Sequence, residues 1–500
     1  MPLACGPVAI VDPLDACASP SIYENLTPEI PPPTHFGWLR NDAGYCAYAY
    51  PLSESYFIVS YAYGPDDRDP AGYGIYLLDR WNNRDLIWRD PRLSAFEAIP
   101  VRIRARPHVV PPNDGSAQES PWGVFYVLDV HRGLDGIPPG TVKRLRIVEE
   151  IPKPVAADCL GSEIQYPVIS RTGHLAVKWI WGTVPVEPDG SAHFLAPADR
   201  AIYFSALDED SMEIQRMRSF THIGRGELTG CIGCHESRRA APPNAPVLAL
   251  RRPPSRIEPP PEVGPHAPDF FYDVQPILDH RCVSCHGGAE PAGGIDLSSD
   301  RTNLFDVAYE TLTGKGLVRY TNGYSCETLP LRRPKSYGSH ASRLVEVLRT
   351  SHRDRAALEP TEFRRLVAWI DCNCPYYGTY TYSRPGTVGG RELFAAHRAA
   401  LAEIHSRRCA PCHGADPARI LERIAFPEVE RTRALRAPLA QAAGGDGSCG
   451  EGVFATSSDP DLERLRAIYE AVAAAEPRRA DMRGERPPIA DPNPRYVHRP

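Results

Sequence analysis

The sequence lacks any apolar run of the roughly 18 residues that a membrane-spanning helix requires, so we expect no transmembrane segment. It also has little lysine, since only five of its 56 basic residues are lysines. Acidic residues outnumber basic ones by 62 to 56, which gives a formal net charge of −6. Proteins that bind nucleic acid need a basic surface, so this balance argues against nucleic acid as a main partner.

The 500 residues are too many for one ordinary core and predict two to four domains. Aromatic and β-branched runs in residues 1–115 resemble one blade of a partial β-propeller, with a small sandwich as the alternative interpretation. Residues 116–240 predict a β-sandwich middle domain with a hairpin turn at Pro188–Ser191. The runs that predict strands are Tyr56–Ala62, Gly74–Asp79, Arg84–Trp88, Val124–Val130, Val142–Val148, Leu175–Trp181, Ala192–Leu195 and Ala201–Ala206.

The second half changes to helical periodicity after a proline-rich linker at residues 241–268, which we expect to be a semi-rigid extended spacer. A helical domain is predicted at residues 269–385, followed by a C-terminal helical region at residues 386–500. The predicted fold class is therefore multidomain α+β, with a β-rich N-terminal half and a mainly α-helical second half. The predicted helices are Val274–His280, Ser342–Arg349, Thr361–Ile370, Glu392–Ser406 and Leu462–Ala474.

Three copies of Cys-x-x-Cys-His occur, at Cys231–His235, Cys282–His286 and Cys409–His413. With 14 Cys and 16 His, chance would place about 0.01 copies in a chain of this length. Two thiols at this spacing can add to the two vinyl groups of one haem, and the adjacent histidine then ligates the iron. We therefore predict a c-type cytochrome with two to three haem c groups, in which residues 269–385 form a cytochrome c-like domain. The predicted anchors are Cys231, Cys234, Cys282, Cys285, Cys409 and Cys412, and the predicted iron ligands are His235, His286 and His413.

Zinc is the competing interpretation, because Cys-x-x-Cys is also half of a structural zinc site. Such a site normally needs a second pair of ligands at a related spacing. The second and third copies each follow a predicted helix, the usual layout of a cytochrome motif. The first copy ends a β domain, which is an unusual setting for a cytochrome haem. A zinc-binding structural or interaction protein therefore stays open as an alternative.

The second axial ligand decides function, because iron with two protein ligands transfers electrons whereas an open position can bind a substrate. His352 follows a predicted amphipathic helix and is our first choice as distal ligand of the second haem, with His340 as the alternative. For the third haem we nominate His397 or His498. The first haem has no obvious distal ligand, because His222 is too close to the first motif in sequence to reach the opposite face of the haem.

The remaining cysteines can pair as disulfides in an exported protein, although the sequence does not reveal which pairs form. Only one residue separates Cys372 from Cys374, a spacing that strains a mutual bridge. These eight cysteines are Cys5, Cys17, Cys46, Cys159, Cys326, Cys372, Cys374 and Cys449.

Covalent haem attachment predicts a periplasmic or other extracytoplasmic protein, because bacteria attach haem c outside the cytoplasm. Such a chain should carry an export signal. Met1–Asp12, however, has neither a basic start nor a long apolar stretch. We therefore expect that the sequence is N-terminally truncated and that the signal precedes Met1.

Several segments resemble the hydrazine synthase alpha subunit-like multihaem cytochrome c family of planctomycetes. Pro51–Tyr61 resembles a late propeller blade of that family. Three segments resemble the middle domain of that family: Gly182–Val186, Asp189–Ala192 and Arg216–His222, the last of which leads into the first motif. Five further segments resemble the C-terminal cytochrome region of that family: Trp369–Asp371, Pro375–Tyr380, Pro438–Ala440, Gly444–Gly445 and Pro492–Val497.

The resemblance implies an N-terminal propeller, a middle domain with one haem c and a C-terminal haem domain with bis-histidine ligation. In hydrazine synthase a tyrosine four residues after the motif histidine ligates the middle-domain haem, where ammonia and nitric oxide are joined. Arg239 occupies that position here. An arginine stays protonated and cannot replace a phenolate ligand. The presence of a third motif is a further point to weigh against a simple match to that family. Because of the arginine and this motif, the resemblance predicts a relative whose reaction is unassigned.

The leading hypothesis is a multihaem cytochrome that transfers electrons to or from redox partner proteins outside the cytoplasm. One alternative is a hydrazine synthase alpha-like enzyme that acts on a small nitrogen compound at the first haem, with other subunits of such a complex as partners. The zinc-binding protein is the third hypothesis, from a different functional class.

Overall fold

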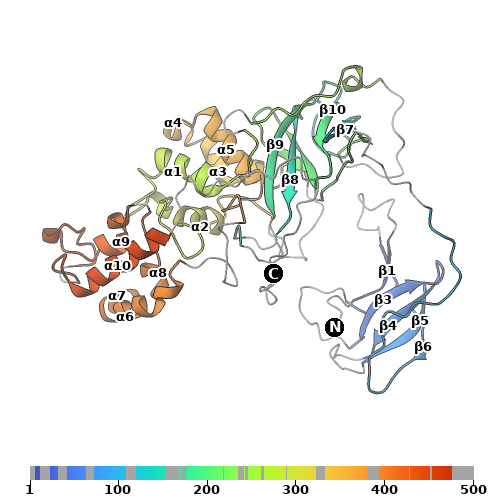
Figure 1. Cartoon of the computed structure of the whole chain (residues 1–500), viewed down its shortest axis with the longest axis horizontal. Coiled ribbons are helices and arrows are strands. Elements are labelled where there is room, and N and C mark those ends of the chain that lie inside the picture. The colour runs from blue at the N-terminus through green and yellow to red at the C-terminus, as the bar shows by residue number, and fades with distance from the viewer. Residues whose placement is uncertain are drawn as a thin grey trace. The chain divides into compact units, whose positions relative to one another are not determined.

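The computed structural model divides into two compact units, one built mainly from residues 1–114 and one built mainly from residues 115–500 (Figure 1). None of the described helices is both long and apolar enough to cross a membrane. The structure describes residues 6–11, 23–31, 42–63, 72–108, 120–153, 168–171, 176–217, 219–234, 241, 246–260, 264–288, 290–321, 333–380, 393–426, 428–450 and 453–475.

The N-terminal unit contains a four-stranded antiparallel sheet in the order β3-β4-β5-β6. Its last three strands lie at or within one residue of the predicted runs, whereas β3 was not predicted. A register shift between Ala47 and Tyr50 interrupts the alternation of β3 and so hides it from the sequence pattern. Four antiparallel strands in chain order are the form of one propeller blade. The strands of this unit are β1 (Ala9–Val11), β2 (Tyr23–Asn25), β3 (Tyr45–Pro51), β4 (Tyr56–Ala62), β5 (Tyr73–Asp79) and β6 (Arg84–Trp88).

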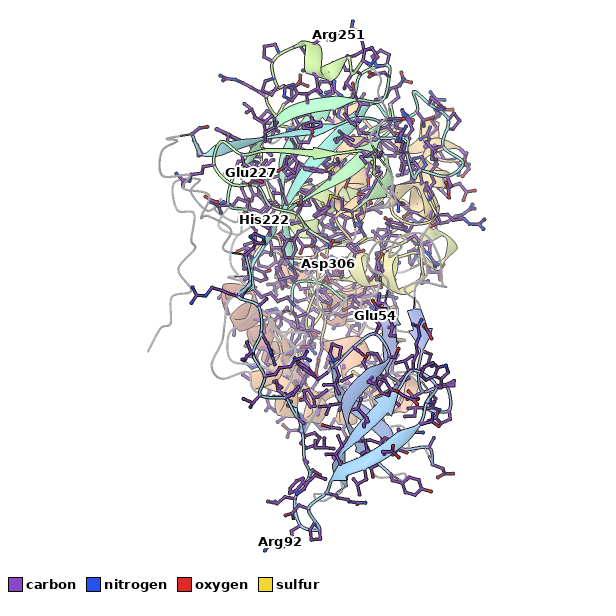
Figure 2. All side chains as sticks on the ribbon, turned by 90° about the vertical axis from the view of Figure 1, so that its right-hand side faces the viewer. Glu54, Arg92, His222, Glu227, Arg251 and Asp306 are labelled. Carbon is purple, nitrogen blue, oxygen red and sulfur yellow. The ribbon has the colours of Figure 1, made fainter. Side chains whose placement is uncertain are left out.

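The second unit begins with two sheets packed face to face, in the orders β10-β7-β13 and β12-β11-β8-β9. Phe125 of the first sheet meets Phe204 of the second with ring centroids 5.2 Å apart, in a core that also contains Trp181. Glu227 and Arg251 lie toward the outside of this sandwich (Figure 2). The strands are β7 (Trp122–Val127), β8 (Arg144–Ile151), β9 (Val177–Pro185), β10 (Ala192–Pro197), β11 (Ile202–Leu207), β12 (Glu213–Arg216) and β13 (Leu228–Cys231).

The proline-rich segment after the sandwich follows the edges of its strands instead of extending as a free spacer. The Leu195 N–H donates to the Ser255 carbonyl at 2.9 Å, and the Glu258 N–H donates to the Thr183 carbonyl at 2.9 Å. At Gly182 the φ angle is +143°, which glycine adopts without strain where Glu258 approaches the strand. Proline blocks regular strand pairing, but isolated backbone bonds between the prolines still fasten the segment to the sandwich.

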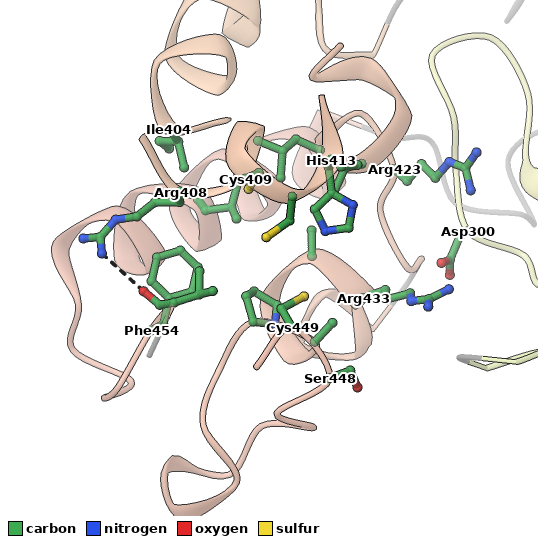
Figure 3. A pocket seen from close by; sticks show the side chains of 18 of the residues that line it. Asp300, Ile404, Arg408, Cys409, His413, Arg423, Arg433, Ser448, Cys449 and Phe454 are labelled. Atoms are coloured by element: carbon green, nitrogen blue, oxygen red, sulfur yellow. Dashed lines mark hydrogen bonds between the residues drawn. The ribbon is translucent and has the colours of Figure 1, made fainter. Parts of the chain in front are cut away.

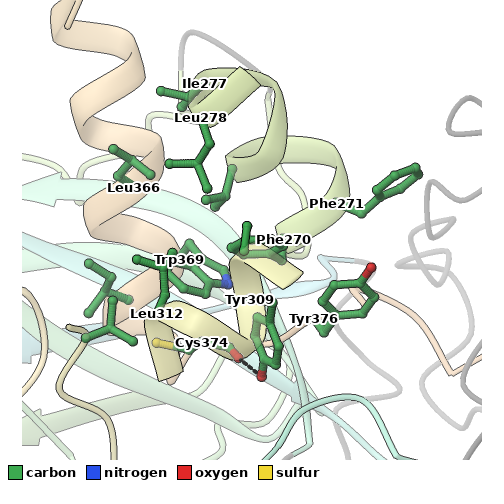
Figure 4. Close-up of a cluster of buried hydrophobic side chains, with 14 of the residues drawn as sticks. Phe270, Phe271, Ile277, Leu278, Tyr309, Leu312, Leu366, Trp369, Cys374 and Tyr376 are labelled. Atoms are coloured by element: carbon green, nitrogen blue, oxygen red, sulfur yellow. Dashed lines mark hydrogen bonds between the residues drawn. The ribbon is translucent and has the colours of Figure 1, made fainter. Parts of the chain in front are cut away.

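The first helical part surrounds an aromatic core that includes Phe270, Tyr309 and Trp369 (Figure 4). The Trp369 indole N–H donates to the Pro375 carbonyl at 2.7 Å, and the Tyr309 hydroxyl donates to the Cys374 carbonyl at 2.8 Å. These bonds satisfy the polar ends of buried aromatic rings. The elements are η4 (Phe270–Val274), α1 (Gln275–Arg281), η5 (Ala292–Gly294), α2 (Val307–Gly314), η7 (Ser339–Ala341), α3 (Arg343–Arg349), α4 (Arg353–Ala356) and α5 (Pro360–Asp371).

The C-terminal part has its own core, which includes Phe394, Phe454 and Tyr469. Backbone bonds between Arg301 and Ile424, at 2.6 and 3.0 Å, fasten it to the first helical part. The predicted helix at residues 392–406 begins later, because residues 395–397 form a separate 3₁₀ turn. The elements are η8 (Ala395–His397), α6 (Arg398–Arg408), α7 (Ala410–His413), α8 (Ala418–Leu421), η9 (Val429–Arg431), α9 (Arg433–Arg436), η10 (Gln441–Ala443) and α10 (Pro460–Ala475). The predicted α+β fold class is confirmed.

The sandwich and the helices meet at a buried carboxylate at the end of α5. Asp371 accepts hydrogen bonds from the backbone N–H groups of Glu213, at 3.1 Å, and Ser339, at 2.8 Å. The Arg146 guanidinium lies 3.5 Å from the same carboxylate, and the Asp371 side chain is 0% exposed. Burial raises the pKa of Glu213 to about 7 and also raises the pKa of Asp371. One side chain therefore holds groups from both parts of this unit.

Candidate haem sites

The second motif continues directly from α1, whose buried Ile277 and Leu278 anchor that helix in the aromatic core. The Cys282 carbonyl accepts the N–H of Cys285 at 3.1 Å and that of His286 at 2.9 Å. These bonds close a turn that places both thiols and the imidazole together. Cys282 is partly buried and Cys285 is exposed. The helix therefore presents the predicted haem anchors at its end.

His286 faces His352 across a short gap. Their ring centroids are 6.2 Å apart and their planes are inclined by 30°. Metal–imidazole bonds are about 2 Å long, and a ring centroid lies about 1 Å behind the bonding nitrogen, so two imidazoles on opposite sides of one metal ion have centroids roughly 6 Å apart. The spacing of this pair therefore fits two axial ligands of one haem iron.

Hydrogen bonds at Nδ1 orient both rings. His286 Nδ1 lies 3.1 Å from the Ala292 carbonyl and 3.3 Å from the Ile295 carbonyl. Carbonyl oxygens can only accept, so Nδ1 of His286 carries the hydrogen and Nε2 is the nitrogen that can ligate a metal. His352 Nδ1 lies 3.1 Å from Ser351 Oγ, which likewise leaves Nε2 for a metal. Such bonds fix the tautomer and the ring orientation of metal-binding histidines.

His340, the alternative distal ligand, has a different neighbour. It lies in η7, and its Nε2 is 3.0 Å from the Asp208 carboxylate of the sandwich. The structure therefore brings His352, and not His340, close to the histidine of the second motif.

The third motif opens onto a cavity of about 480 Å³ (Figure 3). Helix α6 leads into Cys409, whose carbonyl accepts the N–H of Cys412 at 3.1 Å and that of His413 at 3.0 Å. All three motif residues line the cavity. Cofactor sites commonly have volumes of about 300–1,000 Å³, so the cavity has a suitable size. The residues present therefore fit a haem group here.

Arg423, Arg433 and Asp300 lie on one side of this cavity, and Asp296 also lines it (Figure 3). Haem carries two propionate carboxylates, and arginine is well suited to bind carboxylates. Burial raises the pKa of Asp300 to about 6, and Asp296 adds to the rise while the arginines oppose it. The two arginines are therefore candidate ligands for haem propionates, and Asp300 is a group at this cavity that can titrate near pH 6.

The two histidines nominated for the third haem are not placed at this cavity in the described structure. His397 ends η8 and is not among the described cavity-lining residues, and His498 lies outside the described residues. Cys449 and Ser448 line the cavity instead. Sequence reasoning missed Cys449 as a site residue, because it lies far along the chain and no spacing rule connects it to the motif.

The first motif begins at the last residue of β13, which runs parallel to β7. The loop after β7 holds it, since the Leu128 N–H donates to the Cys231 carbonyl at 3.0 Å and the Cys234 N–H donates to the Arg132 carbonyl at 3.2 Å. His235 and Arg239 lie outside the described residues. Cys231 and Cys234 are thus positioned by the sandwich.

Two further histidines belong to this end of the sandwich. His131 Nδ1 lies 3.1 Å from Asp129 Oδ1, and its Nε2 accepts the Gly140 N–H at 3.1 Å. Both ring nitrogens of His131 are therefore already used. His222 is exposed and lies close to Glu227 at the edge of the sandwich (Figure 2).

The cysteines outside the motifs are unbridged where the structure describes them. Within these same described ranges, no group of three or more His, Cys, Asp or Glu side chains is close enough to hold a bare metal ion. The free thiols outside the motifs are Cys46, Cys372, Cys374 and Cys449, while Cys5, Cys17, Cys159 and Cys326 lie outside the described residues.

Comparison with known proteins supports the resemblance seen in the sequence. Residues 140–236 match the family model of the hydrazine synthase alpha subunit middle domain. A solved structure of Kuenenia stuttgartiensis hydrazine synthase shares the fold, with a TM-score of 0.50 and 18% sequence identity. The match covers 78% of this chain and 60% of that chain, so the chain spans less than two thirds of its length. No curated protein sequence matches significantly. The predicted likeness to the hydrazine synthase alpha subunit is confirmed.

Proposed function

We propose that this chain, which contains a hydrazine synthase alpha subunit middle domain at residues 140–236, is a multihaem c-type cytochrome that transfers electrons outside the cytoplasm. The observation that carries the proposal is the pairing of His286 with His352, whose ring centroids are 6.2 Å apart. A haem iron with two protein ligands has no open position for a substrate and is suited to one-electron transfer.

Each motif would hold its haem in the same way. The cysteines would be the covalent anchors and the motif histidine the first iron ligand, with Cys282, Cys285 and His286 as the best supported set. The haem supplies the one-electron chemistry, and the chain orients it and keeps its ligands in place. We propose two to three haem c groups per chain.

The second and third sites are joined by a short segment of chain. The Ile295 carbonyl is 3.3 Å from His286 Nδ1 of the second site. The next residue, Asp296, lines the cavity of the third motif. Adjacent residues of one segment therefore contact the second site and line the third. This proximity supports electron transfer between the second and third haems within one chain.

Redox proteins that donate or accept electrons are the proposed partners, and other subunits of a hydrazine-synthase-like complex are the proposed partners of the sandwich. The comparison structure is described as hydrazine synthase, and its fold is shared over 78% of this chain. The proposed extracytoplasmic location follows from covalent haem attachment.

A redox enzyme that acts on a small nitrogen compound at the first haem is the second candidate function. The observation that favours it is the extent of the family match, which ends at residue 236 and so includes the whole first motif. Arg239 in place of a tyrosine ligand argues against the hydrazine-forming reaction itself. Turnover of nitric oxide or hydroxylamine by the holoprotein would support this function. Failure to turn over either compound, in a holoprotein that still exchanges electrons, would contradict it.

Haem content tests the proposed function directly. After expression with a cytochrome maturation system, intact mass and a pyridine haemochrome assay should give two to three covalent haems per chain. The double variant Cys282→Ala/Cys285→Ala should lose one haem, whereas Cys46→Ala, at a buried free thiol, should lose none. Stoichiometric zinc without covalent haem would contradict the cytochrome and favour the zinc-binding protein.

The reduction potential of the third haem should depend on pH through Asp300. Burial raises the pKa of this carboxyl to about 6. Above that pH the ionised carboxylate favours ferric over ferrous iron, so the potential should fall as pH rises from 5 to 7. Potentiometric titration should show this fall in the wild type and a much smaller one in Asp300→Asn. Equal pH dependence in both proteins would show that another group is responsible.

A further inference from the structure

The loop between α9 and α10 passes along the cavity of the third motif and is held by its backbone. The Cys449 N–H donates to the Ala437 carbonyl at 3.1 Å, and the Gly447 N–H donates to the Leu439 carbonyl at 3.0 Å. Near the end of the loop, Phe454 and Ala440 are joined by a backbone bond of 3.0 Å. These backbone bonds therefore hold the loop both before and after Cys449.

Cys449 presents a free thiol to the same cavity as Cys409, Cys412 and His413. Figure 3 shows its side chain across the cavity from the helix that carries the motif. If haem binds, both motif thiols become thioethers and the motif histidine binds the iron. Among the described residues that line the cavity, Cys449 is then the remaining side chain with a sulfur or imidazole donor.

The other candidate donors at the cavity are less suitable. Asp296 and Asp300 are carboxylates, which are harder ligands than the thiolate, imidazole and thioether groups common on haem iron. Asp300 also lies near the positive charges of Arg423 and Arg433. Burial raises the pKa of the Cys449 thiol, and the positive charge of nearby Arg433 opposes that rise.

We infer that Cys449 Sγ is the second axial ligand of the haem held by Cys409, Cys412 and His413. This inference rests on the proposed function, since it requires haem at the third motif. The chain would then contain a histidine/thiolate haem next to the bis-histidine haem of the second motif. A thiolate donates more electron density to iron than an imidazole, so the third haem should have the lower reduction potential of the two.

Spectroscopy of the holoprotein tests the ligand separately from haem attachment. Cys449→Ala should keep the wild-type haem count but convert one haem from low-spin to high-spin, as seen by electron paramagnetic resonance, and should open it to carbon monoxide. Cys449→His should restore a low-spin haem with the spectrum of bis-histidine ligation and a raised potential. Ser448→Ala, which also changes a cavity-lining residue, should leave the spectrum unchanged.

The outcomes separate the inference from the proposal beneath it. A wild-type chain without haem on the third motif, by intact mass and peptide mapping, would overturn both the third haem and its ligand. A complete haem count with unchanged spectra in Cys449→Ala would overturn only the ligand. In that case another residue would supply the second axial ligand, and the proposal of a third haem would remain supported.

Discussion

His352→Ala is expected to convert the second haem from a six-coordinate low-spin to a five-coordinate high-spin state and to open it to carbon monoxide. The reason is the geometry of the pair, since His352 lies opposite His286 at a centroid distance of 6.2 Å and the alanine leaves no donor there. Loss of a strong axial ligand should also raise the reduction potential, because axial ligands tune haem potentials. Absorption spectra with and without carbon monoxide, and a potentiometric titration, measure these changes.

His340→Ala is the matched control for this prediction. Its imidazole interacts with Asp208 at 3.0 Å, so its removal should leave the spin state and carbon monoxide response of every haem unchanged. Haem counts by intact mass should equal the wild-type value in both variants, since neither residue anchors haem. If His340→Ala produced the high-spin haem and His352→Ala did not, the assignment of the distal ligand would be reversed.

Much of the fold could be predicted because its strands have regular patterns. The runs at residues 56–62 and 84–88 have the bounds that the structure gives β4 and β6. Strand β3 was not predicted, because Tyr48 has a positive φ of 50° and the register shifts beside it. Apolar and polar residues therefore do not alternate along this strand. The proline-rich segment was interpreted as a spacer because its proline content indicates a stiff, extended chain. Amino-acid composition cannot show that single backbone hydrogen bonds, such as that from Glu258 to Thr183, will form.

The candidate sites were predictable only where chemistry is local in the sequence. Cysteine and histidine spacing defines each motif, and His352 was nominated because it follows the amphipathic helix α3. That His352 meets His286, while His340 meets Asp208, depends on tertiary packing. Cys449 lies in a loop without a periodic pattern, so nothing before the structure placed it at the cavity of the third motif.

Asp371→Ala should lower the free energy of unfolding of the sandwich–helix unit by about 3–5 kcal/mol, the usual cost of removing one partner of a buried ion pair. The side chains of Arg146 and Asp371 are 6% and 0% exposed, so the alanine would leave a guanidinium buried without its carboxylate. The backbone N–H of Ser339 would also lose its acceptor, and that of Glu213 would keep only the longer bond to Ser339 Oγ, at 3.3 Å. Urea unfolding followed by far-ultraviolet circular dichroism measures the loss as a lower transition midpoint.

Asp210→Ala provides a control across the same junction. Asp210 forms an ion pair of 2.8 Å with Arg349, but the two side chains are about half exposed, at 51% and 46%. Water screens such a pair, so its loss should cost less than about 1 kcal/mol. Asp371→Asn keeps an acceptor oxygen and should lie between the two alanine variants. Equal midpoints for Asp371→Ala and Asp210→Ala would mean that the apolar contacts between sandwich and helices, and not the buried carboxylate, hold the two parts together.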